Sequence, residues 1–225
     1  MMDNLNDTVI LKCESQKRFA EISKRSNVWE LLLSVASTYS YKEDRYRLWT
    51  YSNKNELISY LNNKNIVCFN GVRFDLPLIL GIDFKCDPTF VLESKENNFF
   101  AVATDIFYKC MQEIYKCHVY SSELFDKMNK HPIPNLKVFS LYNMYTCTLN
   151  KTIPDDIASF DAIESFREKK NLSVIVYNIH RNRIIKSLYE FACKNGYVIN
   201  GDYDILKLSN IIDPKHASID MFMPF

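Results

Sequence analysis

A carboxylate within an apolar segment is the feature that most constrains how this chain can fold. Asp75 lies in segment 74–80, in which every other residue is apolar. The segment has the pattern of a short buried helix that ends at Gly81. It follows an apolar run of strand length at 66–69 and a turn-forming Asn70-Gly71 pair. Burying a carboxylate is costly unless it is paired or binds a metal. Asp75 therefore needs a partner, or it serves as a helix-start residue that the helix dipole favours.

Hydrophobic periodicity and turn residues predict the other elements of the chain. Strands are expected at 8–14, 29–41, 46–51, 66–69 and 99–102, with an edge strand at 197–199. Helices are expected at 53–63, 74–80, 106–115, 136–149, 155–168 and 172–194. A turn at 87–88, a loop or insertion at 118–136 and a tail at 200–225 complete the chain. This order favours an α/β fold with a mixed sheet and helices on both faces, and 225 residues fit a single domain.

Composition and charge narrow the function classes. Hydrophobic residues make up 47% and charged residues 24% of the chain, as in globular proteins. A net charge of +1 argues against strong general affinity for nucleic acid, but it leaves room for a local groove. No apolar run reaches membrane-spanning length, so no membrane contact is expected. The polar N-terminal segment does not resemble a signal peptide. The seven scattered cysteines indicate reduced thiols of an intracellular, cytoplasmic protein.

The segment around Asp75 also resembles a known family. Residues 69–77 read Phe-Asn-x-x-Arg-Phe-Asp-x-Pro and follow a strand. This pattern resembles the second exonuclease motif of the DnaQ-like 3′–5′ exonucleases of the DEDDy type. Similar segments follow in order over about 9–199. The resemblance implies a ribonuclease-H-like mixed sheet of about five strands with helices on both faces. It also implies that Asp75 matches a ligand of the family's catalytic metal pair.

Two of the four metal-binding acids of that family are replaced here. The family's first motif, Asp-x-Glu, falls on Lys12 and Glu14, and its last motif, Tyr-x-x-x-Asp, falls on Tyr177 and Arg181. Alternate strand residues share one face, and helix residues four apart lie one turn apart. Opposite charges at such positions reduce the tendency to recruit a metal. We therefore expect Lys12, Glu14, Asp75, Tyr177 and Arg181 to form a vestigial site of internal ion pairs, with no metal or cofactor.

The resemblance with these two losses leads to a functional expectation. It implies a catalytically inactive exonuclease-like domain that serves as a nucleic-acid-binding or protein-scaffold module in a nucleic-acid-processing assembly. The near-neutral charge and the apolar residues 221–225 favour a protein partner. The alternative is an active 3′–5′ exonuclease with a rearranged site, in which Glu14 and Asp75 would bind Mg²⁺ or Mn²⁺. The sequence carries no signature of a small-ligand site, which would be a third class.

Three further groups of residues have weaker signals. One set of cations could line a phosphate-binding groove or form a solvated surface: Arg73, Lys169, Lys170, Arg183 and Lys186. A second set could be combined into a zinc site but lacks a Cys-x-x-Cys pair, so buried thiols and surface histidines are expected instead: Cys110, Cys117, His118 and His131. The aromatic residues at 39–51 predict a hairpin packed across its strands, with base stacking as the lesser alternative.

Overall fold

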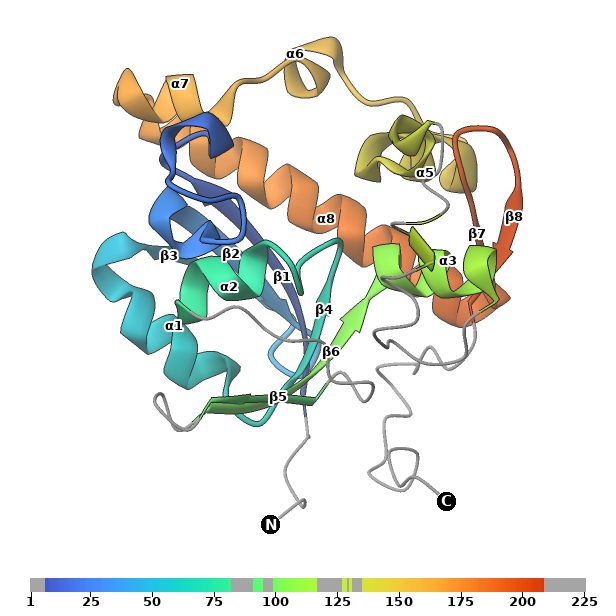
Figure 1. Cartoon of the computed structure of the whole chain (residues 1–225), viewed down its shortest axis with the longest axis horizontal. Helices are drawn as coiled ribbons and strands as arrows, with labels where there is room; N and C mark the ends of the chain where they lie inside the picture. Colours follow the sequence, from blue (N-terminus) through green and yellow to red (C-terminus); the bar gives the residue numbers. More distant parts are fainter. Residues whose placement is uncertain are drawn as a thin grey trace.

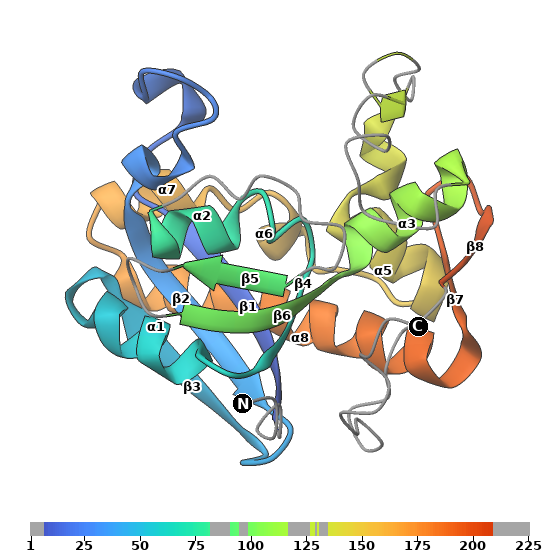
Figure 2. The ribbon, with the colours of Figure 1, turned by 60° about the horizontal axis from the view of Figure 1, so that its bottom comes forward.

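Figure 1 presents a computed structural model of the chain, which describes residues 7–81, 91–94, 99–116, 127–128, 130 and 135–208. The predicted α/β class is confirmed, because a mixed sheet is flanked by helices on both faces (Figures 1 and 2). The predicted turn at 87–88, most of the predicted loop and the apolar residues 221–225 lie outside the described residues.

The main sheet has six strands in the order β3-β2-β1-β4-β6-β5. Their bounds are β1 (Thr8–Ser15), β2 (Leu33–Ser40), β3 (Arg45–Thr50), β4 (Asn65–Cys68), β5 (Val91–Ser94) and β6 (Phe99–Asp105). The pairs β1–β2, β2–β3 and β5–β6 are antiparallel, whereas β1–β4 and β4–β6 are parallel. This arrangement is consistent with the ribonuclease-H-like sheet that the sequence predicted, with β5 as an additional strand at one edge.

The centre of the sheet is the most deeply buried part of the fold. All eight residues of β1 are buried, and Val9, Ile10 and Leu11 expose no surface. A continuous apolar run of this kind is typical of a strand that is covered on both faces. The long helix α8 (Asn171–Asn195) packs along β1 and β2, while α2 (Asp75–Leu80) contacts β1 and α1 (Lys54–Leu61) contacts β3 and β6. Strand β1 is thus packed against α2 as well as α8.

The structure divides two of the predicted helices and shortens one predicted strand at its start. The predicted strand 29–41 begins as a 3₁₀ turn, η2 (Val28–Leu31), because Leu32 adopts a positive φ of 57° and extended structure starts only after it. The predicted helix 136–149 divides into η4 (Leu136–Phe139) and α5 (Leu141–Leu149). The predicted helix 155–168 divides into α6 (Asp155–Ala158) and α7 (Ala162–Arg167).

Side-chain caps explain where the second half of each divided helix begins. Ser140 accepts a hydrogen bond from the backbone N–H of Asn143, and Asp161 accepts from those of Ile163 and Glu164. Such caps satisfy N–H groups that have no partner inside the helix. The helix α3 (Ile106–Tyr115) has the bounds that the sequence predicted. The short 3₁₀ turns η1 (Phe19–Glu21) and η3 (Tyr51–Asn53) lie in connections.

The predicted edge strand at 197–199 is present, but it does not join the main sheet. The strand β7 (Tyr197–Ile199) instead pairs with β8 (Ile205–Lys207) in a separate two-stranded sheet, and β8 falls in the predicted tail. Gly196 ends α8 with a φ of 75°, which directs the chain away from the main sheet. Asn200 then closes the hairpin by accepting hydrogen bonds from the N–H groups of Asp202 and Asp204.

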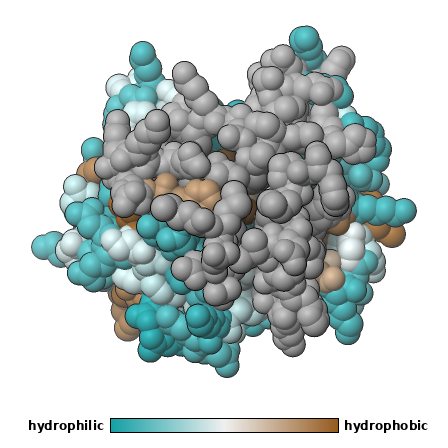
Figure 3. Space-filling model, turned by 90° about the horizontal axis from the view of Figure 1, so that it is seen from below, coloured by the Kyte–Doolittle hydropathy of each residue, from teal (hydrophilic) through white to brown (hydrophobic). Residues whose placement is uncertain are grey.

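Of the described residues visible on the face drawn in Figure 3, most are hydrophilic and a few small areas are apolar. Within the described ranges, no helix combines the length and apolar character needed to cross a membrane.

Candidate functional site

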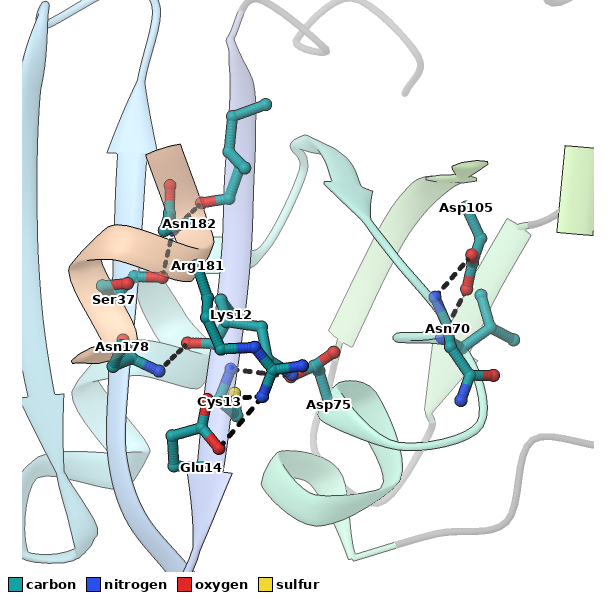
Figure 4. A network of polar contacts seen from close by, with 12 residues as sticks. Lys12, Cys13, Glu14, Ser37, Asn70, Asp75, Asp105, Asn178, Arg181 and Asn182 are labelled. Carbon is teal, nitrogen blue, oxygen red and sulfur yellow. Dashed lines mark hydrogen bonds and ion pairs between the residues drawn. The ribbon is translucent and has the colours of Figure 1, made fainter. Parts of the chain in front are cut away.

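Lys12 and Asp75 form a buried ion pair between the central strand and α2 (Figure 4). The Lys12 Nζ lies 2.8 Å from Asp75 Oδ1, and the two residues expose 3% and 0% of their surface. The backbone N–H of Cys13 donates to the same carboxylate oxygen over 2.6 Å. Asp75 therefore has a cationic partner and a backbone donor, which is the arrangement that a buried carboxylate requires.

The turn that places Asp75 depends on a glycine. A Cβ at Gly71 would lie 2.5 Å from the Cβ of Cys68 and 3.1 Å from Asp75 Oδ2. The Gly71 carbonyl also accepts hydrogen bonds from the N–H groups of Phe74 and Leu76. A side chain at position 71 would force the turn away from β4, and the carboxylate of Asp75 would move with it.

Asp105 anchors the same turn from the end of β6. Its carboxylate, which exposes no surface, accepts hydrogen bonds from the N–H groups of Asn70, Val72 and Phe107. Burial raises the pKa of the Asp105 carboxyl, and the backbone hydrogen bonds offset part of that rise. Sequence reasoning did not assign Asp105 to the site, although this residue directly precedes the predicted helix 106–115. The signal that could have identified Asp105 was an acid at the end of an apolar strand. In the fold this strand pairs with β4, the strand that precedes the turn of Asp75.

Glu14 and Arg181 form a second ion pair, two residues further along β1. Arg181 Nη1 lies 3.0 Å from Glu14 Oε1 and 3.3 Å from Oε2. The Arg181 guanidinium also lies 5.5 Å from the centre of the Tyr177 ring. Burial acts to lower the pKa of Arg181, but Glu14, together with Tyr177, Tyr142 and Asp75, outweighs it and the pKa is raised. The guanidinium therefore stays charged beside the carboxylate.

Two asparagines of α8, which sequence reasoning missed, fix the helix on the sheet. The side-chain amide of Asn178 donates to the carbonyl of Lys12, and that of Asn182 donates to the carbonyls of Ile10 and Ser37. Both asparagines expose no surface. They directly follow Tyr177 and Arg181 in the sequence, and they hold α8 against β1 beside Arg181 (Figure 4). The signal in the sequence was a pair of amides one turn apart in a helix that packs on a sheet.

A cleft of about 510 Å³ opens beside the Glu14–Arg181 pair. We call it the aromatic cleft; its lining residues are Glu14, Ser15, Lys17, Arg18, Phe19, Phe74, Ser159, Phe160, Asp161, Ala162, Ile163 and Tyr177. It lies between the segment that follows β1 and the segment that enters α7. These segments are adjacent in Figures 1 and 2.

Two reciprocal ion pairs join the segments across the rim of the aromatic cleft. Arg18 contacts Asp161 over 2.6 Å, and Arg167 contacts Glu21 over 2.5 Å. A hydrogen bond from the Glu164 backbone and one from Arg18 lower the pKa of Asp161. The N–H of Arg18 and the side chain of Arg167 lower the pKa of Glu21. All four side chains are partly exposed, so the contribution of these pairs to stability is small.

The rim pairs should weaken in acid. A carboxyl whose folded pKa is depressed contributes stability above its unfolded pKa and loses it as the pH falls through the depressed value. The rim pairs should therefore lose their contribution to stability below about pH 4, where model carboxyls titrate.

Carboxyl ¹³C NMR titrations of two matched variants, Arg18→Gln and Arg167→Gln, test the pairing. Arg18→Gln should raise the pKa of Asp161 and leave that of Glu21 nearly unchanged, and Arg167→Gln should do the reverse. Equal shifts at both carboxyls would contradict the pairing.

The residues of the site do not fit a metal pair. Among the described residues, no group of three or more His, Cys, Asp or Glu side chains is placed to hold a metal ion. Glu14 and Asp75 each already contact a fixed cation. Hard divalent cations need several oxygen ligands, and a cation between these two carboxylates would meet Lys12 and Arg181. No catalytic step through a metal follows from this arrangement.

The five cations of the predicted phosphate-binding groove do not all lie side by side. Lys170 pairs with Glu168 over 2.7 Å at the start of α8. Arg183 lies over the ring of Tyr46 at 5.6 Å. At about 1.5 Å per residue, Lys170 and Arg183 are about 20 Å apart along the helix. Arg73 is exposed in the turn before α2, and Lys169 is exposed before α8. Lys186 pairs with Glu190.

The other two predicted groups can be placed only in part. Cys110 is fully buried, while Cys117, His118 and His131 lie outside the described residues. In the aromatic hairpin, Tyr39 and Tyr46 are cross-strand neighbours with ring centres 4.9 Å apart. Cross-strand packing thus accounts for this contact.

Comparison with known proteins adds no assignment. No protein-family model matches the chain, and no curated protein matches it.

Proposed function

We propose that this protein is a catalytically inactive, exonuclease-like domain that acts as a binding or scaffold module in a nucleic-acid-processing assembly. One observation carries the proposal: Lys12 pairs with Asp75 and Arg181 pairs with Glu14. In the resembled family these four positions hold acids around two metal ions. Here each remaining carboxylate is neutralised by a side chain of the chain itself.

The charges of the site explain why catalysis is not expected. Phosphodiester hydrolysis by two metals requires ions that activate water and stabilise the leaving oxygen. The ion pairs leave two negative and two positive charges in the site, which balance without any ion. Lys12 is also packed against the ring of Phe74 at 5.1 Å, and it exposes only 3% of its surface. Its ammonium group is therefore fixed where a dication would have to enter.

The proposal predicts that the purified protein does not degrade nucleic acid. Labelled single-stranded DNA, double-stranded DNA and RNA should each stay intact in the presence of Mg²⁺ or Mn²⁺. The thermal midpoint should also stay constant when either metal is added, because only a ligand that binds the native state raises it. Denaturing gels and thermal scans, each with a chelator control, measure these two results.

The alternative of an active exonuclease makes the opposite prediction. Metal-dependent degradation that disappears in Asp75→Asn would show that Asp75 ligates a catalytic metal. Degradation that persists in Asp75→Asn would instead identify a contaminating nuclease. Arg183→Gln, which changes an exposed residue of α8, is the matched control. It is purified in the same way and shows whether nuclease contamination differs between preparations.

A further inference from the structure

Four aromatic rings line the aromatic cleft as two pairs. Phe19 and Phe74 have ring centres 6.2 Å apart, and Phe160 and Tyr177 have ring centres 4.8 Å apart. The first pair comes from η1 and the turn before α2, and the second from the connection before α7 and from α8. The cleft volume of about 510 Å³ lies within the range of small-ligand pockets. Its lining is therefore suited to a flat or apolar group.

The charges around the cleft balance one another. Beneath it, Lys12 is paired with Asp75 and Arg181 with Glu14. At the rim, the cations are paired with carboxylates across the opening: Arg18 with Asp161 and Arg167 with Glu21. The lining itself contains two cations, Lys17 and Arg18, and two carboxylates, Glu14 and Asp161, so its formal charges sum to zero.

This balance bears on the chemical class of the ligand. Binding of a nucleic acid backbone depends on cations that replace its counterions. In this cleft a phosphate would have to displace a carboxylate from each paired cation that it contacted. An uncharged group does not have to displace a carboxylate, and it can pack against the aromatic rings.

We propose that the aromatic cleft binds an uncharged aromatic side chain presented by a partner protein. This inference rests on the proposed function, because it names the partner class of the inactive module. The inserted ring packs between the two aromatic pairs, and the rim ion pairs exclude water around it. A buried aromatic anchor surrounded by polar rim contacts is a common organisation of a protein interface.

The experiment uses the full chain, labelled with ¹⁵N, and small probes of defined charge. N-acetyl-phenylalaninamide and N-acetyl-tryptophanamide represent the partner side chain, and N-acetyl-glycinamide lacks the ring. Thymidine 5′-monophosphate and a short oligothymidylate represent nucleic acid. The two aromatic amides should shift the backbone signals of the cleft residues in a saturable way, with dissociation constants in the millimolar range. The glycine amide and both thymidine probes should not.

Two exposed aromatic residues provide a matched pair of variants. Phe19, which is 38% exposed in the cleft, can be replaced by alanine without opening the core. Phe19→Ala should weaken binding of the aromatic amides about two- to tenfold, as expected for one lost ring contact. Tyr203, which is 76% exposed on the β7–β8 hairpin, is outside the cleft, and Tyr203→Ala should not change binding.

Two results would overturn the inference. Oligothymidylate that shifts the same signals at lower concentration than the amides would assign the cleft to nucleic acid. Absence of saturable shifts with either aromatic amide would show that the cleft does not accept such a ring. Neither result restores catalysis, so the proposed function would stand or fall separately on the nuclease and metal measurements.

Discussion

Replacement of Lys12 by methionine should destabilise the protein by about 3–5 kcal/mol, which is the cost of leaving a buried charge without its partner. Methionine nearly retains the length and apolar stem of lysine, so the change mainly removes the charge. Asp75, which exposes no surface, would lose its cationic partner and keep the N–H of Cys13 as a hydrogen-bond donor. Chemical denaturation of the parent and the variant measures the difference in the free energy of unfolding.

A second substitution distinguishes a lost charge pair from lost packing. Adding Asp75→Asn to Lys12→Met removes the stranded charge and should recover part of the stability. Lys170→Met is the surface control, because Lys170 is paired with Glu168 but exposed, and exposed pairs contribute little. If the double variant is no more stable than Lys12→Met, the ion pair is not the source of the effect.

The double variant Lys12→Asp with Arg181→Asp should rebuild a four-carboxylate site together with Glu14 and Asp75. Four like charges at these positions should make it much less stable than the parent when a chelator is present. Manganese or magnesium should then stabilise it, by about 2.7 kcal/mol at a metal concentration 100 times the dissociation constant. Activity need not return, since catalysis also depends on substrate alignment.

Calorimetric metal titration compares this variant with two references. The parent should bind neither ion. Lys170→Asp with Lys194→Asp changes the charge by the same amount at two exposed positions, the N-cap and the last turn of α8, and it should also show no specific binding. Metal binding by the parent, or a folded Lys12→Asp, Arg181→Asp protein that binds nothing, would refute the idea that these positions correspond to a former metal site.

The sequence predicted best the elements with strong periodicity and clear ends. The helices α2 and α8 end at Gly81 and Gly196, which both adopt positive φ, and β1 contains the apolar run 9–11. The same reasoning linked Lys12 to Asp75, which are far apart in sequence, because the motif register assigns both to one site. That register is a resemblance, and the contact itself is seen only in the structure.

Prediction from the sequence failed where an element starts late or divides without a change in hydrophobic periodicity. Apolar residues continue through Leu32 and Ser140, so nothing in the pattern predicts that one has a positive φ and the other caps a new helix. The aromatic cleft was also missed, although Phe74 and Tyr177 were both noted. It is formed by two connections that approach each other in space, and their separation along the chain conceals that approach.

The asparagines of α8 have a consequence for how freely this site can change. Asn178 and Asn182 hold the helix through backbone carbonyls of β1 and β2, and not through the side chains at positions 12 and 14. The carbonyl of Lys12 is present whatever residue occupies that position. These hydrogen bonds of α8 are therefore independent of the charges on β1, unlike the pair between Arg181 and Glu14. A frame of this kind lets acids and bases be exchanged within the site while the distance between strand and helix stays fixed.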